Sequence, residues 1–290
     1  MLSLAMTRAI CLCALATLGL WGATRPELAL EIAQQFAGQR ASEQNPKPWL
    51  REVLTRDGAP TFDMVGREAA EDFLALAGNT LADPGLRLAI EKYEAAKAES
   101  VPEFAVEYLR TRLKIRLDEA RELPPPSKPE LRDQIEKLYT EDQQVRQGNR
   151  LAEMSAMDAK HLPVLEAMLD QYGVPTFEMV GRSAANHFVI MLQHMPVRLR
   201  DRSLPLLKKN VDAGQGNPID YAMEFDRTEN DHGRPQIYGE NFHCGPEKVL
   251  VPYATADTDH LAERRARLGL EPIGSKTSMI RIAYGDSLCK

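Results

Sequence analysis

Aromatic residues are scarce in this sequence: Phe, Tyr and Trp make up only 6% of its 290 residues. β-Sandwiches and barrels draw on aromatic and β-branched side chains, so this shortage, beside many Ala, Leu, Glu, Arg and Met residues, favours helices. The chain also lacks a basic excess, since 36 Lys and Arg stand against 42 Asp and Glu. A net charge of −6 gives no electrostatic footprint for nucleic acid, and we expect no nucleic-acid partner.

The familiar catalytic and metal-binding patterns are absent as well. The sequence has no Gly-x-Ser-x-Gly elbow, no phosphate loop of the Gly-Lys-Ser/Thr type and no His-Glu-x-x-His pair. His187 and His194 are seven residues apart on one expected helix, about 10 Å along its axis, which is too far to share a zinc ion. The sequence therefore predicts neither a metal nor a cofactor, and it assigns no reaction.

Long apolar runs are missing except at the N-terminus. Arg8 is the only charged residue before Arg25, and thirteen apolar or small residues occupy 9–21. This pattern is typical of a secretory signal, and it is shorter than the roughly 20 residues of a membrane-spanning helix. We interpret residues 1–24 as a signal peptide and expect an exported protein, periplasmic or secreted, with no stable membrane span. An uncleaved membrane anchor or a misassigned start codon would explain the same residues.

Cysteine is equally sparse, and only Cys244 and Cys289 lie outside the leader. In an oxidising compartment these two could form a disulfide. Because Cys289 is the penultimate residue and chain ends fray, two unpaired thiols are the alternative. Two cysteines alone cannot form a structural zinc site.

What the sequence does contain is an internal repeat. GAPTFDMVGREAAEDF at 58–73 and GVPTFEMVGRSAANHF at 173–188 are identical at eleven of sixteen positions, at a fixed offset of 115. Between the copies, the proline-rich stretch 124–129 is typical of an extended linker. We therefore predict two related helical units, a degenerate one at 25–123 and a second one at 130–290.

Each copy predicts a turn followed by a helix. Gly58 and Gly173 can end the preceding helix in the left-handed conformation, and the Pro and Thr that follow start a turn. Apolar residues at steps of four then predict a buried stripe on the next helix. The stripe consists of Val65, Ala69, Phe73 and Ala77 in the first unit, and of Val180, Ala184, Phe188 and Leu192 in the second.

The pattern changes after Gly233. Strands at 236–242 and 248–252 are expected to form a short β-hairpin. A charged helix at 257–268 and one more short strand at 279–283 follow. The predicted fold class is mainly α: two related helical bundles from an internal duplication, of which the second carries a short C-terminal hairpin.

Short motifs recur through the second unit. In chain order they are Asp142-Gln143 with Arg146, Gly173-Val174-Pro175, Val180-Gly181, Ala184-Ala185, Gln193-His194, Asp226-Arg227, Pro235-Gln236-Ile237-Tyr238-Gly239, and Arg264-Arg265 through Gly269-Leu270. With these motifs the unit resembles the DUF6624 domain family, a bacterial family of unknown function, over about residues 130–273. The resemblance implies a fold and no chemistry. This chain has Met195-Pro196 where the family usually has Ala-Asp, and Glu240-Asn241 where it usually has Thr-Gln.

Polar groups that only the second unit has define a candidate site. At the offset of 115, Gln193-His194 corresponds to Gly78-Asn79, and Asp226-Arg227 corresponds to Thr111-Arg112. The candidate residues are Asp142, Gln143, Arg146, Gln193, His194, Asp226, Arg227, Gln236, Tyr238 and Arg265.

Seven of these residues are expected to meet in space: Asp142, Arg146, His194, Asp226, Arg227, Gln236 and Tyr238. The arginines would pair with the aspartates, and His194 would lie within hydrogen-bond reach of a carboxylate or of Tyr238. Carboxylate, imidazole and guanidinium groups together can bind a polar ligand or act in acid–base catalysis. A buried polar network that ties the hairpin to the bundle, with each group satisfied by another, is the alternative.

Two functions of different classes follow from these observations. One is a ligand- or partner-binding module of the bacterial cell envelope, whose partner is a small polar ligand or an envelope protein. The other is a hydrolase-like enzyme that uses His194 with Asp142 or Asp226. Convergence of the polar side chains at an open cleft would favour the enzyme, whereas their mutual burial would favour a structural role.

Overall fold

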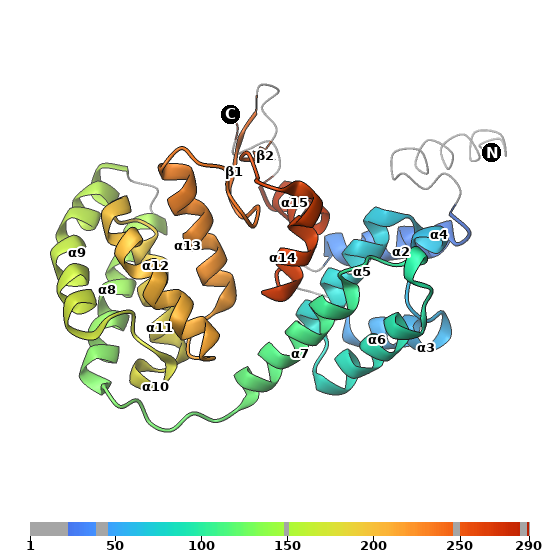
Figure 1. The fold of residues 1–290 in the computed structure, drawn as a ribbon, viewed down its shortest axis with the longest axis horizontal. Helices are drawn as coiled ribbons and strands as arrows, with labels where there is room; N and C mark the ends of the chain where they lie inside the picture. Colours follow the sequence, from blue (N-terminus) through green and yellow to red (C-terminus); the bar gives the residue numbers. More distant parts are fainter. Residues whose placement is uncertain (1–22, 39–45, 148–150, 246–249, 285–288, 290) are drawn as a thin grey trace, which may run out of the picture. The chain divides into compact units, whose positions relative to one another are not determined.

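The computed structural model describes residues 23–38, 46–147, 151–245, 250–284 and 289 (Figure 1). The predicted leader lies outside these ranges except for its last two residues. None of the helices in the described ranges combines the length and the apolar character that crossing a membrane requires.

The described chain forms two compact units. Unit 1 contains the described residues of 23–119, 243–251 and 258–289, and unit 2 contains those of 120–242 and 252–257. The sequence predicted that the whole chain after 130 belongs to the second unit, whereas its C-terminal segment belongs to unit 1. The difference arises because a helix joins the core that buries its apolar face, whatever its place in the chain.

Unit 1 is built of helices around one apolar core. Its elements are α2 (Pro26–Gly38), α3 (Lys47–Arg56), α4 (Phe62–Val65), α5 (Arg67–Thr80), α6 (Asp83–Ala95), η1 (Ala98–Ser100), α7 (Ala105–Ala120), η2 (Thr258–His260), α14 (Leu261–Arg267) and α15 (Ile273–Tyr284). Leu28 and Ile32 of α2, Leu50 of α3 and Phe73 of α5 are fully buried in this core. The buried positions lie three or four residues apart within each helix, as an amphipathic helix requires: Leu28 and Ile32, Leu50 and Val53, and Phe73 and Ala77.

Unit 2 is a second helical bundle, and its helices are drawn from green to orange in Figure 1. They are α8 (Pro129–Gln147), α9 (Leu151–Tyr172), α10 (Phe177–Val180), α11 (Arg182–Leu192), α12 (Val197–Asp212) and α13 (Pro218–Asp231). Helix α11 packs against α8 and α13, and α12 packs against α13. After α13, the strands β1 (Phe242–Cys244) and β2 (Leu250–Pro252) form a short hairpin. The predicted fold class, mainly α with a short hairpin near the C-terminus, is confirmed.

Two of the predicted strands differ from the structure. Only Phe242 of the predicted strand 236–242 lies in a strand, because the preceding residues form a loop in which Gln236 makes a single bridge to Thr255. The predicted strand 279–283 is wrong, because this segment lies within helix α15, which packs against α5. A short apolar run does not by itself distinguish a strand from a buried helix, and here the packing decides.

The repeated segment has the same local structure in both units. In each, a four-residue helix (α4 or α10) ends at a glycine, and a longer helix (α5 or α11) begins directly after it. Gly66 has φ 78° and ψ 161°, and Gly181 has φ 82° and ψ 164°. The apolar stripes predicted on the helices after the turn are buried in both units, as expected. Gly58 and Gly173 have φ of 80° and 70°, which confirms their left-handed conformation.

An arginine follows the glycine in each copy and lies over a phenylalanine ring of the short helix. The guanidinium carbon of Arg67 is 4.2 Å from the centre of the Phe62 ring, and that of Arg182 is 4.8 Å from the centre of the Phe177 ring. These cation–π contacts give the repeated arginines a structural role at the turn.

The similarity of the units also includes the first helix of each. The sequence Arg-Pro-Glu-Leu at 25–28 opens α2, and Lys-Pro-Glu-Leu at 128–131 opens α8, at an offset of 103. The backbone N–H groups before these helices bind carbonyl oxygens at equivalent places in the repeat. Thr24 and Arg25 donate to Asp63 and Met64, and Ser127 and Lys128 donate to Glu178 and Met179, at N···O distances of 2.8 to 3.1 Å. This match has a different offset from the 115 residues of the repeat, because α8 and α9 are longer than α2 and α3.

Replacement of Gly181 by Ala is expected to destabilise unit 2 by about 1–3 kcal/mol. Its combination of φ and ψ is open to glycine and strained for every other residue. Space is not limiting, because an added Cβ would lie 4.0 Å from its nearest neighbour, Pro126 Cγ. Urea unfolding of Gly181→Ala measures the loss, with Asn186→Ala on α11 as the control. A loss of less than about 0.5 kcal/mol would contradict the strain argument.

Candidate functional site

A partly buried ion-pair network joins α8 to α9 at one side of the candidate site. Asp142 of α8 is 1% exposed, and Arg146 Nε lies 2.9 Å from each of its carboxylate oxygens. Arg146 also pairs with Asp158 of α9, and the side-chain amide of Gln143 donates to Asp142 Oδ2 at 2.9 Å. Burial acts to lower the pKa of Arg146, but the hydrogen bonds and charges of Asp142 and Asp158 together outweigh it, so the pKa is raised and the guanidinium stays charged.

His194 is half-buried just beyond the end of α11, beside this network. Burial and the positive charge of Arg146 lower its pKa to about 4, although the charge of Asp142 acts in the opposite direction. The imidazole is therefore neutral at pH 7. Within the described part of the chain, it forms no hydrogen bond to a carboxylate or to Tyr238, contrary to the expectation from the sequence.

Arg227 of α13 is the fourth charged group near this histidine. Its side chain is exposed, and its charge contributes to lowering the pKa of His194. Arg227 forms no ion pair with any residue in the described part of the chain. The charges of Asp142 and Arg146 on α8 and of Arg227 on α13 thus all act on His194, just beyond the end of α11.

Asp226, the neighbour of Arg227, faces the other way and anchors a loop. Its carboxylate is fully buried and accepts from the backbone N–H groups of Ile237 at 2.7 Å, Tyr238 at 3.0 Å and Glu240 at 2.9 Å. Burial raises the pKa of Asp226, and these three backbone bonds oppose the rise only in part. Both carboxylate oxygens are occupied, so Asp226 holds the loop after α13 and is not available for proton transfer.

Gln236 and Tyr238 belong to the same structural network. The Gln236 side-chain amide donates to the carbonyl oxygens of Asn241 at 3.2 Å and Tyr253 at 3.1 Å, and its oxygen accepts from the Asn241 N–H at 2.9 Å. The Tyr238 ring packs edge-on against Tyr221 and Phe225, with ring centres 6.2 and 5.9 Å apart. The geometry of Asp226, Gln236 and Tyr238 is that of a structural network, which was the alternative to a ligand site.

The two remaining candidates are Arg265 and Gln193. Arg265 is fully buried in unit 1, where its Nε donates to the carbonyl oxygen of Glu271 at 2.7 Å. Gln193 directly precedes His194 and is buried. Its side-chain nitrogen Nε2 has no hydrogen-bond partner within the described ranges.

Sequence reasoning missed two buried charged residues of unit 2, Arg200 and Glu224. Glu224 of α13 is 0% exposed, and neither of its carboxyl oxygens has a partner among the described residues. Burial raises its pKa to about 8, against the opposing charges of Arg200 and Arg227. A signal for Glu224 did exist: it is three residues after Tyr221 and four before Thr228, and both of these are buried on the same face.

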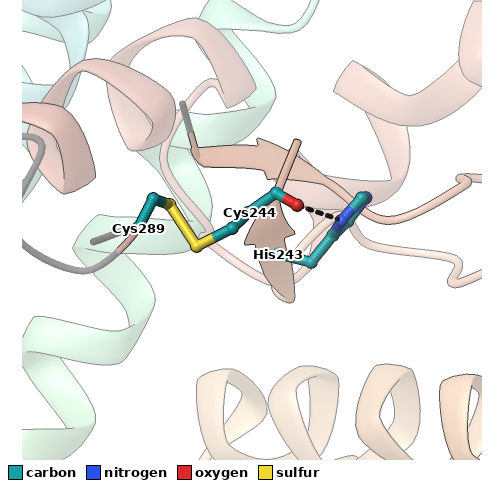
Figure 2. The surroundings of a disulfide bond; sticks show 3 residues. All are labelled: His243, Cys244 and Cys289. Atoms are coloured by element: carbon teal, nitrogen blue, oxygen red, sulfur yellow. Dashed lines mark hydrogen bonds between the residues drawn. A yellow bond between two sulfur atoms is a disulfide. The ribbon is translucent and has the colours of Figure 1, made fainter. Parts of the chain in front are cut away.

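Cys244 and Cys289 form a disulfide in unit 1, as Figure 2 shows. Their Cα atoms are 5.4 Å apart, and the bond links β1 to the end of the chain. The neighbouring His243 ring nitrogen Nδ1 lies 3.3 Å from the carbonyl oxygen of Cys244. The two cysteines are therefore not the unpaired thiols of the alternative interpretation.

No group of three or more His, Cys, Asp or Glu side chains in the described ranges is placed to hold a metal ion. The fold and the polar residues together define a two-unit helical-bundle protein whose second unit carries a polar cluster around His194 and Arg227. The chain matches, over residues 129–288, the model of a family of unknown function, DUF6624, and belongs to that family. No curated protein and no solved structure matches it.

Proposed function

We propose that this protein is a ligand-binding module of the bacterial cell envelope, and that its second unit binds a small polar ligand at His194 and Arg227. One observation carries the proposal: a neutral, half-buried imidazole lies beside an exposed guanidinium that has no ion-pair partner among the described residues. The charges of the Asp142–Arg146–Asp158 network act on the imidazole. Groups held by such ion pairs keep their positions before a ligand arrives.

Comparison of the two units supports this assignment. Arg112, at the offset of 115 from Arg227, is buried and donates to the carbonyl oxygen of Gly78 at 3.1 Å. Asn79, at the same offset from His194, donates to Glu271 at 3.0 Å. In unit 1 the side chains at these positions form hydrogen bonds within the unit. In unit 2 the side chains of Arg227 and His194 form no hydrogen bond to another described residue, so their polar atoms can bind a ligand.

The proposal of an envelope location rests on the leader and on the disulfide. The leader pattern at 1–24 is that of an exported protein. A disulfide between Cys244 and Cys289 is typical of an oxidising compartment such as the periplasm. Fractionation of cells that express the full-length chain tests this part, and an intact Met1 on protein recovered from the cytoplasm would overturn it.

The hydrolase-like alternative has less support from the geometry. Asp226 uses both carboxylate oxygens to hold backbone N–H groups, and Asp142 is paired with Arg146. A histidine whose pKa is about 4 is also a weak general base at neutral pH. We therefore favour binding over catalysis.

We expect the ligand to be found by a thermal-shift screen of small polar compounds against residues 24–290. This chain omits the predicted leader and keeps the backbone bonds of Thr24 and Arg25. A ligand that binds only the folded state raises the melting temperature, and the rise grows with the logarithm of the ligand concentration relative to Kd. His194→Ala is expected to weaken the binding of such a compound at least about tenfold, which corresponds to about 1.4 kcal/mol. The control is His232→Ala, which removes a histidine paired with Asp201 on α12. Equal affinity of the two variants would refute the role of His194.

A further inference from the structure

The C-terminal helix α15 covers part of α5 within unit 1. The two helices approach closely where α15 begins. A Cβ added at Gly274 would lie only 2.8 Å from Glu71 Oε2, which shows how near the backbone of α15 comes to this carboxylate. The next residue, Ser275, is 1% exposed. The start of α15 is therefore pressed against the side of α5 that carries Glu71.

The apolar core of unit 1 is formed almost entirely by other helices. Its buried members lie at 28–109, and among the described residues only Ala266 of α14 joins them from the C-terminal segment. Helix α15 contributes Met279, which is only partly buried against this core. Because burial of apolar surface is the main stabilising contribution to a fold, the core can stay folded when α15 is detached.

The turn before α15 is attached to unit 1 by bonds of its own. Arg112 of α7 donates to the carbonyl oxygen of Gly269 at 3.5 Å, and the side chain of Asn79 on α5 donates to Glu271 at 3.0 Å. Pro272 follows directly. These bonds involve neither α15 nor the disulfide, so Pro272 marks a boundary between a fixed turn and a helix that can detach.

The side of α5 next to α15 is acidic. Glu68, Glu71 and Asp72 lie within one turn of each other on it, and Arg67 pairs with Glu71 at 3.4 Å. Asp72 is 5% exposed, and its Oδ1 has no hydrogen-bond partner within the described ranges. Burial raises the pKa of Asp72 to about 7, although the hydroxyl of Ser275 acts in the opposite direction. The contact between α15 and α5 thus has an electrostatic cost whenever Asp72 is ionised.

The disulfide links the chain beyond α15 to strand β1 (Figure 2). Cys289 is 8% exposed, whereas Cys244 is an exposed residue, so a small dithiol can reach this half of the bond. Exposed disulfides are more labile than buried ones, and regulatory disulfides are found among them. Outside the predicted leader the sequence has no other cysteine, so a reductant acts on this bond alone.

We propose that the Cys244–Cys289 disulfide is a redox switch that controls the attachment of α15. When a dithiol reduces the bond, α15 leaves α5, the core of unit 1 stays folded, and the acidic side of α5 (Glu68, Glu71 and Asp72) becomes exposed. This inference goes beyond the proposed ligand binding and does not depend on it.

The exchange reaction balances with the dithiol as the reductant. One of its thiolates attacks the sulfur of Cys244, the bond between the two cysteines breaks, and Cys289 leaves as a thiolate. The second thiol of the reductant then displaces Cys244 from the mixed disulfide. Two electrons and the two thiol protons pass to the protein, so both cysteines end as thiols and the reductant ends as a disulfide.

The test follows hydrogen exchange of residues 24–290 by mass spectrometry, before and after treatment with dithiothreitol in the absence of denaturant. After reduction, the amides of α15 beyond its first turn are expected to exchange at least about tenfold faster, whereas those of α3 and α6 keep their rates. Cys289→Ser is expected to show the fast exchange of α15 without any reductant. Treatment of Cys289→Ser with dithiothreitol is the control, and it should change nothing because this variant has no disulfide.

A second variant tests the electrostatic cost. In the reduced protein at about pH 8, where Asp72 is mostly ionised, Asp72→Asn is expected to slow the exchange of α15 at least about threefold, because a neutral amide favours the attached helix. Glu107→Gln, which changes an exposed residue of α7, is the matched control and should leave the exchange unchanged. Equal exchange in the two reduced variants would show that Asp72 does not oppose the attachment of α15.

Three results are incompatible with a redox switch. If dithiothreitol reduces the bond only after denaturant is added, the disulfide is closed to reductants in the folded protein. If α15 exchanges at the same rate before and after reduction, the disulfide does not hold it. If α3 and α6 speed up as much as α15, reduction unfolds the whole unit, and the disulfide has only a structural role.

Discussion

Glu224→Gln is expected to remove much of the pH dependence of this protein's stability. Burial raises the pKa of Glu224 to about 8 in the folded state, from a value of 4.5 for the free side chain. The folded protein therefore holds this proton up to about pH 8, whereas the unfolded chain loses it near pH 4.5. Because the folded state binds more protons in this window, the free energy of unfolding falls as pH rises through it.

The size of this effect follows from the shift. One pKa unit corresponds to about 1.4 kcal/mol, so the loss between pH 6.5 and pH 8 is about 2 kcal/mol for Glu224. This range is the clearest to measure, because His194, whose pKa is lowered to about 4, acts in the opposite direction between pH 4 and pH 6.5. Asp220 and Asp72, whose pKa values burial raises to about 7, add to the fall at lower pH.

The measurement is a series of thermal unfolding curves from pH 5 to pH 9 for the wild-type chain and for two variants. Glu224→Gln has no proton to lose, so at pH 8 its melting temperature should exceed that of the wild type by about 5 °C. Glu229→Gln serves as the control on the same helix, because Glu229 pairs with Arg234 and its pKa is lowered. If the wild type and Glu224→Gln lose stability in parallel above pH 6.5, Glu224 does not retain its proton in the folded state.

Asp226→Ala is expected to destabilise unit 2 by about 3–5 kcal/mol. Its carboxylate accepts from the backbone N–H groups of Ile237, Tyr238 and Glu240. Each buried donor that loses its acceptor costs about 1–3 kcal/mol, and partial access of water to the loop reduces the sum. Asp226→Asn keeps one acceptor oxygen and should lose roughly half as much.

Urea unfolding measures the loss, and hydrogen exchange of the three amides shows where it occurs. The matched control is Asp212→Ala, which removes an exposed aspartate that pairs with Lys208 four residues earlier. The amides of 237, 238 and 240 should exchange faster in Asp226→Ala than in the control. A loss below about 1 kcal/mol with unchanged exchange would show that Asp226 does not anchor the loop.

Part of the candidate site was predictable from the sequence. Asp142 and Arg146 are four residues apart on one helix, and such pairs face each other by the geometry of the helix alone. Comparison of the two copies also points to His194, because the first copy has Asn79 at its place. The neutral state of His194 was not predictable, because it depends on burial and on the charge of Arg146 from another helix.

Other parts of the site were assigned to the wrong environment or overlooked. Asp226 and Arg227 are adjacent in sequence, but successive residues of a helix point about 100° apart, so one anchors a loop and the other faces solvent. Arg265 belongs to unit 1, because the chain returns there after β2. No pattern in the sequence pointed to Asp158, because its ion pair with Arg146 depends on how α9 is rotated against α8.

The sequence by itself determined the local features of this protein. Backbone preferences and helical periodicity act over a few residues, so they determine the glycine between the short and long helices, the buried stripes of Phe73 and Phe188, and the repeat that relates the two segments. Only the tertiary structure decided that Glu224 and Arg200 are buried together, that Arg227 lies beside His194, and that α15 packs on α5. The physical reason is that contacts between distant segments depend on the rotation and packing of whole helices, which no local pattern of residues specifies.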